Sequence, residues 1–174
     1  TLTPTNPNCY YGATGKVMAN PTGGTPYLPP HDTYNYSWSN GESTQEITGL
    51  AEGWYTVTVT DSLGCVFIDS VQLVAPDEIT LVSLDITPPD CHGSVSGIID
   101  IVATGGTGDL EYQLNDTPVF QPDGHFTSVP FGYHTVTVRD ENLCTASFTA
   151  VVDQPDLLVV SIAADTVHIN CFGG

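Results

Sequence analysis

Basic residues are almost absent from this chain of 174 residues. Lys16 and Arg139 are the only two, against 20 Asp and Glu, and the formal net charge is −18 with neutral histidines. Proteins that bind nucleic acid or anionic membranes use Lys and Arg to displace counterions from phosphates. The composition therefore argues against nucleic acid as a partner and against direct membrane contact. Such an acidic surface suits a soluble chain in salty surroundings, and binding of a divalent cation such as Ca2+ is the alternative use of the acids.

Long apolar runs and catalytic motifs are also missing. No stretch approaches the roughly 20 apolar residues of a transmembrane helix, and no signal peptide opens the chain. There is no nucleophile elbow, no phosphate-binding glycine loop, and no cysteine or histidine pair at zinc-ligand spacing. We therefore expect no enzymatic activity, no catalytic residue and no cofactor beyond the Ca2+ considered above.

The chain does repeat itself, with a period of about 80 residues. GWYTVTVTDSLGC at 53–65 returns as GYHTVTVRDENLC at 132–144, and Gly-Gly and Pro-Asp pairs recur at matching offsets. A period of this length is domain-sized, so it predicts an array of small domains cut from something longer, and not a short-repeat solenoid. The predicted units are residues 1–76 (a repeat without its first strand), 77–155 (a second repeat) and 156–174 (the start of a third).

Strand signals dominate both units, and helical periodicity is missing. β-branched residues alternate in the two Thr-Val-Thr-Val stretches, which suits a half-buried pleated surface. Asn-Gly, Asp-Gly and Gly-Gly pairs mark the turns between strands. About seven short strands per unit predict an all-β fold, with tandem immunoglobulin-like β-sandwich domains of about 80 residues in a rod-like array. The valines expected on the core faces are Val57, Val59, Val136 and Val138.

Four of the five cysteines can be paired within the two predicted units. One bridge within each sandwich predicts Cys9–Cys65 and Cys91–Cys144, each closing a loop of roughly 55 residues and contributing about 4 kcal/mol in the chain-entropy estimate. Free buried thiols or a metal site are the alternatives, although the wide spacing argues against zinc. Cys171 is then expected to find its partner outside the chain. Disulfides indicate an oxidising, extracytoplasmic compartment.

Two aspartates follow the repeated strands. Asp61 and Asp140 stand where a carboxylate can accept backbone N–H bonds and close a hairpin, with calcium ligation as the alternative. At the start of the same strands, Tyr55 stands where sandwich domains place a corner tyrosine, whose hydroxyl binds nearby backbone. His134 takes that position in the second unit and retains a hydrogen-bond donor.

The aromatic residues divide between core and surface. We assign Trp38 to the core of the first sandwich, against its predicted disulfide. Trp54, Tyr10 and Tyr11 are the candidates for exposed contact, where an aromatic ring with an apolar face could stack on a sugar.

The first unit carries a longer set of motifs. Cys9 and Gly12 are followed by GGTP, YSWSNG, ITGLAEGWYTVTVTDSLGC and AP. Together these motifs cover nearly the whole unit, and they resemble the SprB repeat of very long cell-surface adhesins in gliding bacteria of the Bacteroidota. The second unit departs from the pattern, because YQLNDTP replaces the tryptophan strand, His134 the tyrosine and Leu143 the glycine before the cysteine.

The resemblance implies export by type IX secretion, display on the bacterial cell surface and a role in adhesion or gliding. It implies no catalytic residue. An Asp-[Ser/Thr]-aliphatic pattern, similar to the O-glycosylation signal of these bacteria, marks Ser62 and Thr166 as candidate sugar acceptors, with ordinary turn or strand chemistry as the alternative.

The junction between the units is short. Only APDE separates their strands, and Pro76 fixes its own backbone angle and restrains the residue before it. We therefore expect a stiff structural and adhesive segment of an extracellular bacterial surface fibre. Its expected partners are neighbouring repeats of the same chain and, beyond them, other fibre chains, glycans or abiotic surfaces. The alternatives are a carbohydrate-binding or stalk module of a secreted enzyme, and a filament subunit that polymerises by donating the strand LLVVSIA to another copy.

Overall fold

The computed structural model describes residues 1–27 and 34–161, and every regular element in these ranges is a β-strand. Nothing in them forms a helix of the length and apolar character that a bilayer crossing requires. The all-β class predicted from the sequence is confirmed. The strands are β1 (Leu2–Thr5), β2 (Gly15–Ala19), β3 (Asn35–Trp38), β4 (Glu46–Leu50), β5 (Gly53–Thr60), β6 (Val66–Leu73), β7 (Asp77–Thr87), β8 (Gly97–Gly106), β9 (Glu111–Leu114), β10 (His125–Val129), β11 (Gly132–Arg139) and β12 (Thr145–Val152).

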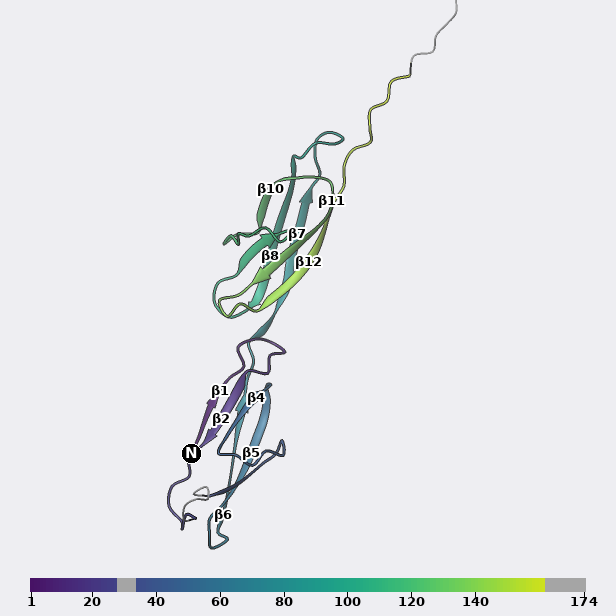
Figure 1. Cartoon of the computed structure of the whole chain (residues 1–174). Coiled ribbons are helices and arrows are strands. Elements are labelled where there is room, and N and C mark those ends of the chain that lie inside the picture. Colours follow the sequence, from purple (N-terminus) through teal and green to yellow (C-terminus); the bar gives the residue numbers. More distant parts are fainter. Residues whose placement is uncertain (28–33, 162–174) are drawn as a thin grey trace, which may run out of the picture.

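The twelve strands form four antiparallel sheets of three strands each. Sheets β1-β2-β4 and β3-β5-β6 enclose one core, and we call this half the first sandwich. Sheets β7-β8-β10 and β9-β11-β12 enclose another core in the same strand order, and we call this half the second sandwich. The two lie end to end (Figure 1). Each described sandwich is immunoglobulin-like but has six strands, one fewer than the seven or so expected from the sequence.

Alternation along the strands decides which side chains enter the cores. On β5 and β11 the expected valines face inward, and all four are buried. Trp38 on β3 is also buried, and its indole N–H donates to the carbonyl of Thr44 at 2.8 Å. The assignment of Trp38 to the core is therefore confirmed, although no disulfide packs beside it in the described structure, since the bridge lies elsewhere.

Each sandwich uses the same device at the start of one central strand, β5 in the first sandwich and β11 in the second. The Tyr55 hydroxyl donates to the carbonyl of Ala51 at 3.1 Å, as a corner tyrosine does. In the second sandwich His134 Nε2 lies 2.8 Å from the carbonyl of Pro130, four residues upstream in the same way. Because a carbonyl only accepts, Nε2 carries the proton, and Nδ1 accepts from the amide of Asn115 at 2.7 Å. The imidazole thus replaces the phenol at this corner.

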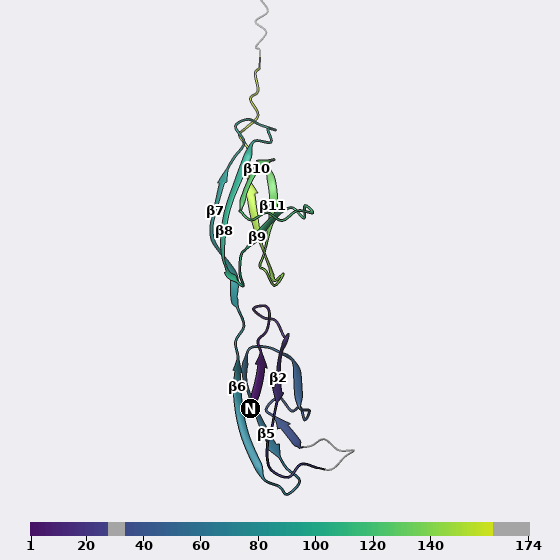
Figure 2. The ribbon, with the colours of Figure 1, turned by 90° about the vertical axis from the view of Figure 1, so that its left-hand side faces the viewer.

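A very short connection joins the two sandwiches. β6 ends at Leu73 and β7 begins at Asp77, with Pro76 directly before it. Figure 2 shows the chain passing from β6 into β7 without a loop. The Val74 N–H is held by the side-chain oxygen of Asn6 at 3.1 Å. The connection therefore has little free length in which to bend.

The turn after β11 contains a strained residue. Leu143 has φ +65°, whereas the matching position in the first sandwich is Gly64 with φ +81°. A left-handed backbone costs a residue with a Cβ about 1–2 kcal/mol relative to glycine, and Leu143 is exposed and buries little in return.

We expect Leu143→Gly to raise the free energy of unfolding by about 0.5–1 kcal/mol, because relief of the strain exceeds the entropy that glycine adds to the unfolded chain. Denaturant unfolding under oxidising conditions measures the change. Leu63→Gly is the matched control, since Leu63 is equally exposed but does not have a positive φ. The Leu63→Gly substitution should leave the free energy of unfolding unchanged or lower it. An equal increase from both substitutions would contradict the proposed backbone strain at Leu143.

Candidate functional site at the junction between the sandwiches

A disulfide joins the two sandwiches. Cys9 is bonded to Cys144, with the two Cα atoms 5.6 Å apart and 135 residues apart in sequence. The predicted bridges Cys9–Cys65 and Cys91–Cys144 are therefore wrong. Cys65 and Cys91 are free and exposed. Cys171 lies outside the described residues.

Strand direction explains the error. The pairings make β1, β3, β4 and β6 run toward the junction, and β2 and β5 away from it. Because β3 and β4 run the same way, the chain does not reverse between them, and the β5–β6 turn lies at the far end from the β1–β2 loop. Cys65 in that turn therefore cannot reach Cys9. Strict up-and-down alternation would have placed both cysteines at one end.

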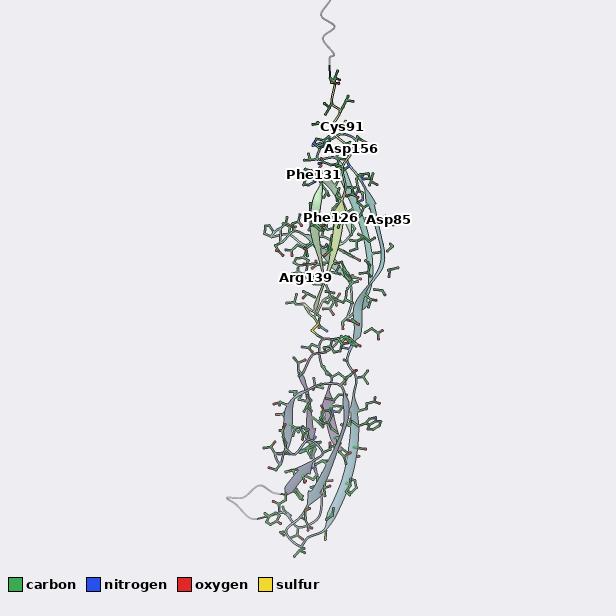
Figure 3. The ribbon with its side chains drawn as sticks, turned by 90° about the vertical axis from the view of Figure 1, so that its right-hand side faces the viewer. Asp85, Cys91, Phe126, Phe131, Arg139 and Asp156 are labelled. Carbon is green, nitrogen blue, oxygen red and sulfur yellow. A yellow bond between two sulfur atoms is a disulfide. The ribbon has the colours of Figure 1, made fainter. Side chains whose placement is uncertain are left out.

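The second sandwich has the same arrangement. Cys144 precedes β12 at the junction, and Cys91 follows β7 at the opposite end, near Asp156 (Figure 3). All four cysteines lie in loops at the ends of the sandwiches, and none crosses a core between its sheets. Each sandwich thus presents one cysteine at each end.

A small cavity lies beside the bridge. It has a volume of about 330 Å³, and its wall includes Tyr10, Tyr11, Glu78 and Asp140. The two tyrosine rings lie 4.1 Å apart, and the neighbouring Tyr11 raises the pKa of Tyr10. The side-chain amide of Asn142 donates across the junction to the carbonyl of Asn8 at 3.0 Å. The structure thus brings the candidates Tyr10 and Tyr11 to the contact between the sandwiches.

The aspartate after β11 holds the turn that presents the bridging cysteine. Asp140 is buried, and its carboxylate accepts from the backbone N–H of Thr107 at 2.8 Å and of Cys144 at 2.9 Å. Its own N–H donates to the carbonyl of Cys144 at 3.0 Å. These bonds close the turn, as expected from the sequence, and they position the cysteine toward the first sandwich.

Asp61 holds the turn that carries the free cysteine Cys65 in the same way. Its carboxylate accepts from the N–H groups of Thr25 at 3.0 Å, Leu63 at 3.0 Å and Cys65 at 2.8 Å. These hydrogen bonds, that from Thr25 foremost, lower the pKa of Asp61. Backbone donors thus occupy both carboxylates. Within residues 1–27 and 34–161, no three His, Cys, Asp or Glu side chains are grouped as a metal site.

The remaining sequence candidates lie apart from the junction. Trp54 is 66 % exposed on β5, opposite Gln72 of β6. Ser62 lies in the exposed turn before Cys65, and its hydroxyl donates to the carbonyl of Thr25 at 2.8 Å. Thr166 lies outside the described residues. The structure does not bring these candidates together.

Both basic residues are held by acids. Lys16 Nζ lies 3.7 Å from a carboxylate oxygen of Glu46. Arg139 forms a pair with Glu111 at 2.7 Å and stacks over the ring of Phe120 at 3.8 Å. The rest of the charge on the described surface is therefore acidic.

Comparisons with known proteins give one family and one solved structure that are similar to this chain. The SprB repeat family matches residues 1–43 and 83–118, which confirms the resemblance seen in the sequence. Among curated proteins, none matches the chain. A solved structure, the C-terminal 282-residue fragment of intimin in complex with the intimin-binding domain of its translocated receptor, is similar at 16 % identity with a TM-score of 0.47. That alignment covers 87 % of this chain and 63 % of the intimin fragment.

Removal of the bridge should loosen the junction without unfolding the sandwiches. In the double variant Cys9→Ser/Cys144→Ser, we expect circular dichroism to retain the β signal while small-angle X-ray scattering shows a broader range of end-to-end distances. The free energy of unfolding should fall by about 4–5 kcal/mol, because the bridge closes a loop of more than 100 residues. Cys91→Ser, which removes a free thiol, is the control, and equal behaviour of both variants would contradict the role of the bridge.

The stability should depend on pH through Asp61. Because its folded pKa lies below the unfolded value of about 3.9, its contribution is present above that value and lost as pH falls through the folded pKa. We expect Asp61→Asn to melt at a lower temperature at pH 7 and to lose less on going from pH 5 to pH 2. Asp153→Asn, at an exposed position, should follow the wild type. Parallel curves for Asp61→Asn and wild type would contradict the assignment.

Proposed function

We propose that this chain is a structural and adhesive segment of an extracellular bacterial surface protein, in which sandwiches stacked end to end supply length and stiffness. The observation that carries the proposal is the bridge between Cys9 and Cys144. The two matches to the SprB repeat support it, because such repeats occur in cell-surface proteins. A disulfide also fits an oxidising compartment outside the cytoplasm.

The junction is suited to bearing load because the sandwiches are attached at two points. One is the covalent chain, in which only 74–76 lie between β6 and β7. The other is the disulfide, whose cysteines lie in loops of opposite sandwiches. A single flexible link permits rotation in all directions, whereas two separate links restrict it to a small range. Each added sandwich therefore extends the reach of the protein with little loss to bending.

The surface chemistry suits exposure to an extracellular medium. The sequence has only two basic residues, so proteases that cleave after Lys or Arg find few sites. The net charge of −18 makes neighbouring fibres repel each other at low salt. Gliding motility and type IX secretion belong to this proposal through the SprB resemblance, and the partners we propose are neighbouring repeats, glycans and abiotic surfaces.

Trp54 favours a second candidate function, carbohydrate binding in the stalk of a secreted protein. Its ring is 66 % exposed, and the matching residue of the second sandwich, Tyr133, is exposed as well. Repeated aromatic rings on the outer faces of β5 and β11 could stack on successive sugars of a polysaccharide.

The two candidates can be separated in the protein displayed on its own cells. We expect Cys9→Ser/Cys144→Ser to lower the force needed to detach cells from a surface, with equal display measured by antibody. Trp54→Ala/Tyr133→Ala should leave that force unchanged if the segment acts by stiffness, and should lower it together with binding to a glycan array if the aromatic rings are the contact. Unchanged detachment for both variants would overturn the proposal.

A further inference from the structure

The cavity beside the disulfide has walls from both sandwiches. Tyr10 and Tyr11 come from the first sandwich, and Glu78 and Ile79 come from β7 of the second. The two sides are joined by the chain and by the bridge between the sandwiches. The wall residues are therefore held in place relative to one another, and a ligand would meet a site of about 330 Å³ that is already formed.

The fold does not require the tyrosine pair in this wall. The N–H of Gly12 donates to the carbonyl of Cys9 at 2.9 Å and closes the turn that carries the pair. The second sandwich forms the same turn, because the N–H of Ser94 donates to the carbonyl of Cys91 at 3.0 Å. The two residues inside the turn are Tyr10-Tyr11 in the first sandwich and His92-Gly93 in the second.

The outer tyrosine presents its ring to solvent. Tyr11 is 86 % exposed, so its ring adds little to either core. The rings of Tyr10 and Tyr11 are tilted by 54° to each other, and they are therefore not stacked face to face. An exposed aromatic ring at a cavity mouth, at a position where the fold accepts glycine, points to contact with another molecule.

Negative charge surrounds the same rings. The pKa of Tyr10 is raised first by Tyr11, and the carboxylates of Glu78 and Glu52 raise it further. A charge shifts the pKa only of a group that lies within its field, so both carboxylates act on this ring. Glu78 and Glu52 are exposed. The cavity thus combines aromatic rings with a negative electrostatic potential.

This combination is suited to an organic cation. The face of an aromatic ring is negative and attracts a cation within about 6 Å of its centre, and a nearby carboxylate adds an ion pair. The chain uses these two components once for its own arginine. The guanidinium of Arg139, labelled in Figure 3, lies 3.8 Å from the centre of the Phe120 ring and 2.7 Å from a carboxylate oxygen of Glu111.

The cation for the junction cavity must come from another molecule, because Lys16 and Arg139 are paired with other glutamates. The wall also includes Ile79 and Ala146, which suit the aliphatic stem that arginine and lysine carry below their charge. Arginine fits better than lysine, since its planar guanidinium stacks on aromatic rings and is less strongly hydrated. The net charge of −18 would attract a basic protein surface to this face.

We propose that the junction cavity binds an arginine side chain exposed on a partner protein, with the aliphatic stem on the apolar wall and the guanidinium beside the Tyr11 ring and the Glu78 carboxylate. A basic protein surface is a partner beyond the repeats, glycans and abiotic surfaces considered above. The contact requires only the two folded and bridged sandwiches. It does not depend on the role of the segment in adhesion.

A short peptide with blocked ends, acetyl-Gly-Arg-Gly-amide, tests the proposal on the full oxidised chain. We expect two-dimensional NMR in low salt to show saturable shifts of the amides of Gly12, Ile79 and Cys144. The dissociation constant should be on the order of 1 mM, because an exposed cation–π contact and an exposed ion pair are each weak. Binding should weaken several-fold in about 0.5 M salt.

The matched peptide contains citrulline, whose uncharged urea group has nearly the shape of guanidinium. We expect it to bind about tenfold more weakly or worse, since it keeps the stem and loses both the cation–π attraction and the ion pair. A lysine peptide should bind between the two. This series separates recognition of the charge from contact with the apolar wall.

Substitutions locate the site. We expect Tyr11→Ala and Glu78→Gln each to weaken binding of the arginine peptide about two- to fivefold, and the double variant about tenfold. Both residues are exposed, so the variants should fold, and an unchanged number of free thiols checks that the bridge is retained. Tyr133→Ala and Asp153→Asn, at exposed positions of the second sandwich, are the controls and should bind like the wild type.

Three results would overturn the proposal. The first is equal binding of the arginine and citrulline peptides. The second is binding that Tyr11→Ala and Glu78→Gln leave unchanged, which would indicate general attraction to the acidic surface. The third is a stronger shift of the same amides by a neutral sugar such as N-acetylglucosamine, which would make the cavity a carbohydrate site. None of these results bears on the detachment force of displayed cells, so a failure here is distinguishable from a failure of the proposed function.

Discussion

The disulfide between Cys9 and Cys144 is the contact on which the arrangement of this protein depends. It ties the two sandwiches together where the chain itself provides only 74–76 as a connection. The second attachment point converts a short hinge into a restricted joint. An array of sandwiches without such a joint would bend freely at the connection. Any function that requires an extended protein therefore depends on the disulfide.

The bridge depends in turn on the turns that carry the cysteines. Asp140 accepts from the N–H of Cys144, and Asp61 accepts from the N–H of Cys65. A buried aspartate thus holds the turn of one cysteine in each sandwich. In the first sandwich that turn lies at the end opposite the Cys9 loop, and in the second it lies at the end opposite the Cys91 loop. Use of the aspartates for this purpose also accounts for their burial, since no other acid among residues 1–27 and 34–161 is buried.

Much of the fold was predictable from local patterns. The buried faces of β5 and β11 follow from alternation of valine and threonine, and the corner tyrosine at Tyr55 follows from its place before that strand. The exchange of Tyr55 for His134 was also predictable, because both side chains can donate one hydrogen bond to a carbonyl four residues upstream. The disulfide partners were not predictable in this way, because a bond between residues far apart in sequence depends on which end of the sandwich each one occupies.

The amino-acid sequence by itself determined the strands, their inward faces, the internal repeat and the turns closed by Asp61 and Asp140, since each depends on residues that are neighbours along the chain. Only the tertiary structure decided that Cys9 meets Cys144 and that Tyr10 and Tyr11 lie at the junction. The physical reason is that β3 and β4 run in the same direction. Because the chain does not reverse direction between β3 and β4, the β5–β6 turn lies at the end of the sandwich opposite the β1–β2 loop. No pattern among neighbouring residues indicates this.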